Sequence, residues 1–99
     1  MSAKKQPNGG AALTKELTVA NVAGLHMRPA KDIVMIANRF RCDLFVEKDG
    51  HRVNGKSIMG LLTLVAGHGS KLTVHTEGPD ASAAMAEIEA LFKRKFNEE

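Results

Sequence analysis

The sequence predicts an α+β fold in which a four-stranded antiparallel sheet carries three helices on one face. Some short segments alternate apolar and polar residues, as strands do, whereas others repeat apolar residues at helical spacing. Gly, Pro and Asp residues separate these segments and predict turns. In chain order the segments give β-α-β-β-α-β-α. Helices on one face of such a sheet bury every apolar stripe and leave the other face to water.

The first half of the chain supplies a strand, a helix and a hairpin. Leu17 and Val19 alternate with polar neighbours and predict a strand that starts from Thr14, reaches toward Asn21 and ends before Gly24. Residues 27–39 form a predicted helix with an apolar stripe of Ala30, Ile33, Val34, Ala37 and Phe40. Residues 42–47 and 51–54 are the expected strands of a hairpin, because Lys48-Asp49-Gly50 tolerates the positive φ of a tight turn.

The second half supplies a short helix, a strand and a long helix. Ser57 is the expected N-cap of the short helix. Leu72, Val74 and Thr76 alternate with polar residues as the fourth strand, and Gly78-Pro79-Asp80 forms a turn that caps the last helix. That helix carries a stripe of Ala84, Met85, Ile88, Leu91, Phe92 and Phe96.

Composition predicts one small domain and argues against some classes of function, nucleic-acid binding among them. Residues 1–14 of the 99 are polar, small and contain Gly and Pro, so we expect a disordered tail before a domain at 15–99. The domain is nearly balanced in charge and poor in aromatic residues, which argues against nucleic-acid binding. A single Cys42 and the lack of a signal peptide or bilayer-spanning apolar run favour a cytoplasmic protein without membrane insertion. A monomer is the default expectation, because the sequence does not fix the oligomeric state.

The segment Gly24-Leu25-His26-Met27-Arg28-Pro29-Ala30 points to phosphate chemistry. His26 lies where a loop meets a helix, and Pro29 fits the first helical turn because it has no amide hydrogen to lose. The free amides and dipole of a helix N-terminus attract anions, and the Arg28 guanidinium matches phosphate oxygens. A neutral imidazole is a nucleophile, so His26 is the predicted phosphoryl acceptor and Arg28 the group that stabilises the phosphate.

These residues resemble the active-site signature Gly-Leu-His-x-Arg-Pro-Ala of the histidine-containing phosphocarrier family, HPr. Asn54-Gly55-Lys56-Ser57-Ile58-Met59-Gly60-Leu61-Leu62 resembles its second signature, around a regulatory serine, and Glu77-Gly78-Pro79-Asp80-Ala81 resembles the turn into its last helix. The resemblance runs from about Leu17 to Phe96.

The resemblance implies an open-faced β-sandwich and a covalent carrier rather than a stand-alone enzyme. It implies that Nδ1 of His26 takes phosphate from Enzyme I of the phosphoenolpyruvate-dependent phosphotransferase system and passes it to Enzyme IIA-type domains, in sugar transport or nitrogen-related control. Ser57 would be the substrate of an HPr kinase/phosphorylase in organisms that have one. The carrier needs no cofactor.

Partners need a surface on which to dock. Ile58, Met59 and Leu62 are candidates for a small exposed apolar patch, because a helix this short cannot turn all three toward the core, and Leu62 is the one that best fits the core. Met27 would lie beside the imidazole. Arg28, Lys31 and Lys56 are candidates for a basic rim that speeds encounter with acidic partners.

Two other functions fit parts of the sequence. A regulatory binding module would act through the Ser57 face alone. A small acylphosphatase-like enzyme would also place an Arg in a phosphate-binding loop, although the Gly-rich loop with a catalytic Asn is not evident. His51, His68 and His75 are irregularly spaced and lack a cysteine pair, so we expect no metal site.

Overall fold

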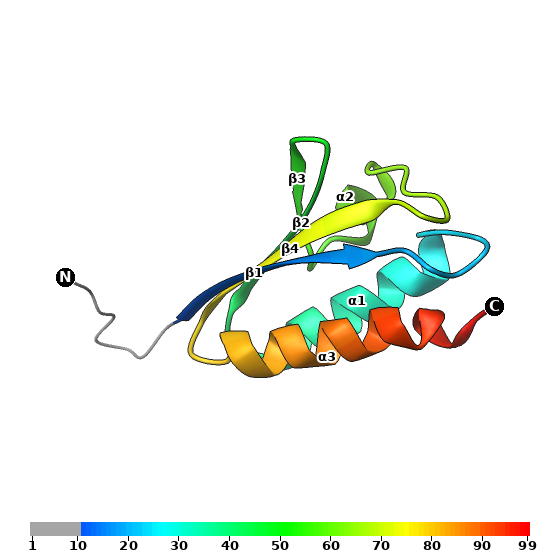
Figure 1. Ribbon diagram of the computed structural model, residues 1–99. Coiled ribbons are helices and arrows are strands. Elements are labelled where there is room, and N and C mark those ends of the chain that lie inside the picture. The colour runs from blue at the N-terminus through cyan, green and yellow to red at the C-terminus, as the bar shows by residue number, and fades with distance from the viewer. Residues whose placement is uncertain (1–10) are drawn as a thin grey trace.

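A computed structural model describes residues 11–99 of the chain. Its elements follow the predicted β-α-β-β-α-β-α order, and the predicted fold class is confirmed (Figure 1). The elements are β1 (Ala11–Thr18), α1 (Met27–Arg39), β2 (Asp43–Lys48), β3 (His51–Asn54), α2 (Ile58–Leu62), β4 (Lys71–Gly78), α3 (Ala81–Lys93) and a short final turn at Lys95–Asn97.

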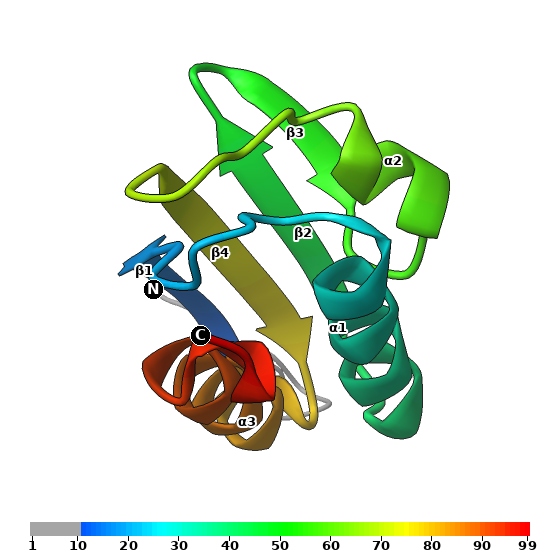
Figure 2. The same cartoon turned by 90° about the vertical axis from the view of Figure 1, so that its right-hand side faces the viewer.

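The sheet has the strand order β1-β4-β2-β3, and all of its pairs are antiparallel. β4 therefore lies inside the sheet, where Val74 is opposite Lys15 of β1 and Val46 of β2. The predicted hairpin joins β2 to β3, with φ of 51° at Asp49 and 84° at Gly50. Helices α1 and α3 lie side by side on one face, and α2 packs against α1 beside β3 (Figure 2).

Strand β1 begins earlier than the sequence predicts. Residues 11–14, placed in the tail, pair with residues 75–78 of β4. Pairing uses backbone groups, so the small, weakly patterned Ala-Ala-Leu-Thr segment can extend an edge strand without an apolar stripe. The strand also ends earlier, at Thr18, so Val19 and Asn21 lie in the following loop. The remainder of the predicted tail, residues 1–10, lies outside the described residues.

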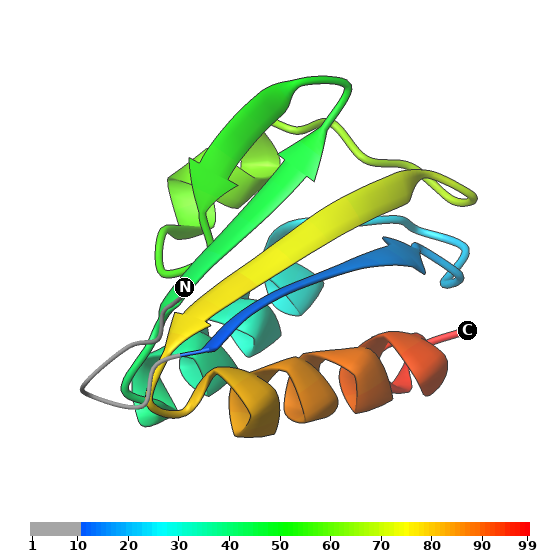
Figure 3. The same ribbon diagram turned by 60° about the vertical axis from the view of Figure 1, so that its left-hand side comes forward.

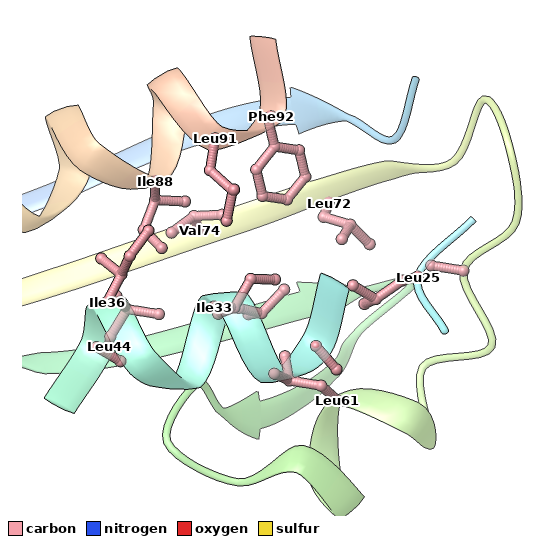
Figure 4. Packing of buried hydrophobic residues seen from close by; sticks show 14 of the residues in the cluster. Leu25, Ile33, Ile36, Leu44, Leu61, Leu72, Val74, Ile88, Leu91 and Phe92 are labelled. Carbon is pink, nitrogen blue, oxygen red and sulfur yellow. The ribbon is translucent and has the colours of Figure 1, made fainter. Parts of the chain in front are cut away.

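The core fills the space between the sheet and the two long helices. Ile33 of α1 and Ile88 of α3 are fully buried above Leu72 and Val74 of β4 (Figure 4). Leu61 of α2 closes the core beside α1 and is also fully buried. Since this packing holds α1 against both the sheet and α2, it fixes the position of the N-terminal end of α1.

The other face of the sheet carries polar contacts, as the alternation in β1 and β4 predicts. His75 on β4 lies between two partners, with its Nδ1 3.2 Å from Thr14 Oγ1 and its Nε2 3.1 Å from Glu47 Oε1. On neighbouring strands, the Arg52 guanidinium stacks over the Phe45 ring at 4.2 Å from its centroid. These contacts occupy His75 on the face away from the helices.

The turn into α3 differs in one detail from the prediction. Asp80 is at the N-cap position, but its side chain makes no capping bond. Its Oδ2 instead accepts a hydrogen bond of 2.7 Å from the backbone N–H of Arg41. The carboxylate therefore ties the start of α3 to the segment before β2, a contact across 39 residues that local sequence rules do not anticipate.

Candidate phosphoryl-acceptor site

The loop before α1 is anchored on one side and open on the other. Leu25 is buried and its N–H donates to Ala66 O at 2.8 Å, which ties the loop to the segment after α2. Gly24 has a φ of 77°, and a Cβ there would lie 2.7 Å from Ala66 O. Only glycine fits this turn without displacing backbone. The loop therefore turns sharply at Gly24, and the anchored chain presents His26 to solvent.

His26 occupies the N-cap position of α1, which begins and ends at the predicted residues. Its carbonyl accepts from the N–H of Ala30 at 3.0 Å, but its ring makes no capping bond. Within residues 11–99, the N–H groups of Met27 and Arg28 donate to no backbone acceptor. Those two amides and the helix dipole form the kind of positive environment in which anions bind.

One ring nitrogen of His26 is held by a residue that the sequence analysis missed. Nε2 lies 3.1 Å from Oε1 and 3.0 Å from Oε2 of Glu98. An ionised carboxylate only accepts hydrogen bonds, so Nε2 carries the proton and donates. In the neutral ring Nδ1 then carries the lone pair. The His26 side chain is 44% exposed and that of Glu98 only 13%, so the carboxylate lies beneath a ring that faces outward.

Asn21 joins the loop to the same carboxylate. This fully buried side chain donates from Nδ2 to Gly24 O at 2.7 Å and to Glu98 Oε1 at 2.9 Å. Its Oδ1 has no partner among the described residues. Asn21 thus acts as a brace between the turn that precedes His26 and the chain end. The sequence analysis placed it toward the end of the first strand and gave it no role.

The C-terminal segment, residues 95–99, reaches the site through an unusual turn. Lys95, Phe96 and Asn97 have φ of 55°, 55° and 60°, in a region that costs a non-glycine residue about 1–2 kcal/mol. The Phe96 ring is fully buried and packs on Phe92 with centroids 4.8 Å apart. The chain end lies next to the loop after β1 in two views (Figures 1 and 3), where Val22 N–H donates to Glu99 O at 2.6 Å.

Electrostatics favour the ionised form of Glu98. The hydrogen bond from His26, followed by the one from Asn21, holds the pKa of the Glu98 carboxyl below its ordinary value. The positive charges of His26 and Arg28 lower this pKa further, whereas partial burial opposes them. The effect of the Arg28 guanidinium on this pKa is the smallest of these.

A pH-dependent loss of stability is expected from this carboxylate. Because the folded-state pKa of Glu98 is lowered, its stabilising effect is complete above the ordinary value near 4.5 and disappears as the pH falls through the lowered value. Urea midpoints of wild type and Glu98→Gln should therefore differ at neutral pH and converge in acid. Glu99→Gln, at an exposed neighbour, is the control. A wild-type advantage over Glu98→Gln that persists unchanged into strong acid would contradict this assignment.

The three predicted basic residues do not all lie on the same element. Arg28, the predicted phosphate ligand, and Lys31 lie on α1, whereas Lys56 lies just before α2. Arg28 and Lys31 are exposed on the first turns of α1. Arg28 makes no side-chain hydrogen bond or ion pair within the described part of the chain. Lys56 is also exposed, but its charge acts on the thiol of Cys42, beyond the opposite end of α1.

Ser57 caps α2 as predicted. Its Oγ accepts a hydrogen bond of 3.0 Å from the N–H of Gly60. The apolar candidates divide into two groups: Met27 and Met59 are 62% and 72% exposed, whereas Ile58 and Leu62 are partly buried against the core. Of the three residues of the expected apolar patch, Met59 is therefore the one that is strongly exposed, and Met27 is a second exposed methionine on α1. Val22 and Val65 are also strongly exposed, and the sequence analysis did not single them out.

The other histidines have separate surroundings. His51 Nε2 lies 3.0 Å from Thr63 Oγ1, and His68 is exposed in the loop before β4. No group of three or more His, Cys, Asp or Glu side chains that could hold a metal ion occurs within residues 11–99. In the same residues, no helix is both long and apolar enough to cross a bilayer. Cys42 is buried, and this burial is the main cause that raises the pKa of its thiol.

Similarity to known proteins assigns the chain to a class. Residues 13–94 match the family described as "PTS HPr component phosphorylation site". The chain is 48% identical to phosphocarrier protein HPr of Treponema pallidum, over 88% of this chain and 99% of that protein. It is 46% identical to HPr-like protein Crh of Halalkalibacterium halodurans, over 82% of this chain and 96% of that protein.

A solved structure supports the same assignment. HPr-C-His from Thermoanaerobacter tengcongensis matches 88% of this chain and 98% of its own, with a TM-score of 0.84 and 37% identity. An open-faced sandwich with these relatives is a phosphocarrier rather than a stand-alone enzyme, so the acylphosphatase-like alternative is wrong. The chain belongs to the HPr family of the phosphotransferase system.

Proposed function

We propose that His26 accepts a phosphoryl group on Nδ1 from Enzyme I and passes it to an Enzyme IIA-type domain. The observation that carries this proposal is the exposed ring at the start of α1, with Nε2 bound to Glu98 and Nδ1 unoccupied by any described residue. A neutral ring in this state has its nucleophilic lone pair on Nδ1.

The surroundings of His26 suit a phosphorylated ring. The amides of Met27 and Arg28 have no backbone acceptor within residues 11–99, so they are available to phosphate oxygens. The exposed guanidinium of Arg28 can approach the same oxygens with its two-pronged geometry. These groups carry partial or full positive charge where the transferred group is negative. Their role is electrostatic, and neither has to move a proton.

The docking surface we propose centres on Met27 and Met59, which project from the contacting helices α1 and α2. Methionine side chains adapt to several partners, as a carrier with two successive docking partners requires. Lys31 adds positive charge on α1 for encounter with acidic surfaces. Ile58 and Leu62 support the surface from the core side, and Lys56 contributes at its far edge. A small interface of this kind favours short-lived complexes.

Labelling from phosphoenolpyruvate tests the proposal directly. Incubation with Enzyme I and labelled phosphoenolpyruvate should transfer label to the protein in an acid-labile form, as phosphohistidine requires. Addition of an Enzyme IIA-type domain should then remove the label. Peptide mapping at neutral pH should place it on the peptide containing His26. Failure of an active Enzyme I to label the wild-type protein would contradict the proposal.

Ser57 offers a second, regulatory modification. A phosphate on this N-cap would lie at the positive end of α2, where charge is tolerated, yet beside Met59 on the proposed docking surface. We propose that an HPr kinase/phosphorylase, where present, uses ATP to modify Ser57 and weakens docking. Acid-stable phosphate on wild type and its absence from Ser57→Ala would support this role. Label that persists on Ser57→Ala would place the modification elsewhere.

Substitution of Ser57 also distinguishes the phosphocarrier proposal from the alternative of a regulatory binding module. Ser57→Ala should lower the free energy of unfolding by about 1 kcal/mol, because the bond from Gly60 N–H is lost. It should leave labelling by Enzyme I intact. Urea denaturation measures the first effect, with the exposed Ser82→Ala as the matched control. If His26→Ala retained the function of the protein and Ser57→Ala lost it, the regulatory-module alternative would be the better one.

We further infer a cytoplasmic monomer, since the one cysteine is buried and each helix packs on the chain's own sheet or on its neighbouring helix. The phosphotransfer partners would then meet His26 from solvent, without a second copy of this chain at the site.

A further inference from the structure

The conformation of the C-terminal segment, residues 95–99, places the Glu98 carboxylate in contact with His26. Three consecutive left-handed residues turn the chain back after α3, and the buried ring of Phe96 fixes this turn to the core. Two residues later, Glu98 meets His26 Nε2 and Asn21 Nδ2. The backbone bond from Val22 to Glu99 closes the arrangement on its far side. A chain end would not adopt three unfavourable residues in succession without compensation from these contacts.

The carboxylate approaches the ring from the side that the transfer does not use. Nδ1 and Nε2 lie on opposite sides of the imidazole, so a group that approaches Nδ1 need not displace Glu98 from Nε2. The carboxylate is mostly covered, with a side chain that is 13% exposed, and Asn21 limits its freedom to rotate. The charge of the Arg28 guanidinium also favours its ionised form. Glu98 therefore has a fixed position relative to the imidazole.

We propose that Glu98 is a positioning residue for phosphoryl transfer, which keeps the proton of His26 on Nε2 and the lone pair on Nδ1. The inference rests on the proposed carrier function. A second role follows from the same contact. When Nδ1 forms a bond to phosphorus, the ring becomes positively charged with its proton still on Nε2, and Glu98 is the counter-ion 3.0 Å away.

The transfer balances without proton movement. The Nδ1 lone pair forms the N–P bond as the bond between phosphorus and the Enzyme I donor breaks, and that electron pair stays with the donor. On transfer to the acceptor domain, the N–P bond breaks and its electron pair returns to Nδ1. The leaving group is then a neutral imidazole with Nε2 protonated, not an imidazolate. Glu98 holds the required proton in place through both steps.

The test measures the ring tautomer, which a purely structural role would not change. ¹⁵N NMR of the neutral wild-type ring should show the proton on Nε2. In Glu98→Ala we expect a mixture of both tautomers, and a rate of labelling by Enzyme I that falls about tenfold, the lower end of what loss of the carboxylate partner costs at metal-bound histidines. Glu98→Gln keeps an acceptor near Nε2 and should lie between them. Glu99→Gln should match wild type.

The outcomes separate this inference from the carrier function. If Glu98→Ala keeps both the wild-type tautomer and the wild-type labelling rate while His26→Ala takes no label, Glu98 is not a positioning residue and the carrier function stands. If wild type takes no label either, the carrier function fails first. A folded Glu98→Ala with a slower rate but an unchanged tautomer would also overturn the positioning role, since its effect would then arise elsewhere.

Discussion

His26→Ala is expected to abolish phosphoryl transfer from Enzyme I and leave the fold intact. The loss should be complete because the variant lacks the nitrogen that forms the bond to phosphorus. Stability should change little, by about 1 kcal/mol or less, because the ring is half-exposed and makes no N-cap bond. The main interaction lost is the one with Glu98. Acid-labile label after incubation with Enzyme I measures the first effect, and urea denaturation the second.

A histidine elsewhere on the surface provides the matched control. His68→Ala changes an exposed loop residue with the same side chain and should be labelled as well as wild type. His75→Ala tests a ring that is bound to Thr14 and Glu47 on the other face of the sheet, and it too should be labelled. Label on a folded His26→Ala, or its loss from His68→Ala, would assign the acceptor to a different residue.

Phe96→Ala is expected to cause the largest loss of stability, about 3–5 kcal/mol. Its ring is fully buried and packs on Phe92, so truncation leaves a cavity as well as lost apolar contact. The turn at Lys95–Asn97 would lose the anchor that offsets its left-handed backbone. We therefore expect Glu98 to leave His26 in this variant. Urea denaturation and the ¹⁵N signals of His26 measure the two effects.

Phe45→Ala is the matched control for Phe96→Ala. Phe45 is half-buried on the polar face of the sheet, under the Arg52 guanidinium and away from the helices. Truncation of Phe45 should lower the free energy of unfolding clearly less than Phe96→Ala does, and it should leave the His26 tautomer unchanged. Equal losses of stability in the two variants would mean that Phe96 does not anchor the C-terminal segment.

Local signals in the sequence predicted the elements with short-range causes. Pro29 in the first turn and the apolar stripe after it gave the bounds of α1, because both act within a few residues. The Asp49-Gly50 turn and the Ser57 cap depend on neighbouring backbone in the same way. The start of β1 was placed too late, because edge pairing with β4 depends on a partner about 65 residues away.

The site was predictable in part for the same reason. His26 and Arg28 belong to one short segment that also carries the resemblance to HPr. Glu98 is 72 residues away and follows a left-handed turn that contains no glycine and in which only Asn97 is a residue type that favours this backbone. Asn21 looked like a strand residue because it continued an alternating pattern. Neither contact has a local signature, because each needs the fold that brings residues 95–99 to the loop after β1.

If His26 accepts the phosphoryl group as proposed, the exposure of its ring limits how long the phosphorylated form can persist. Sites that close over a reactive intermediate protect it from hydrolysis, but this ring is 44% exposed and lies on a surface. Between partners, a phosphoramidate at this position would face water with only Arg28 and two helix amides beside it. The phosphoryl group would therefore have a finite lifetime on the ring. The concentration of acceptor domains would then determine what fraction of it is transferred before hydrolysis.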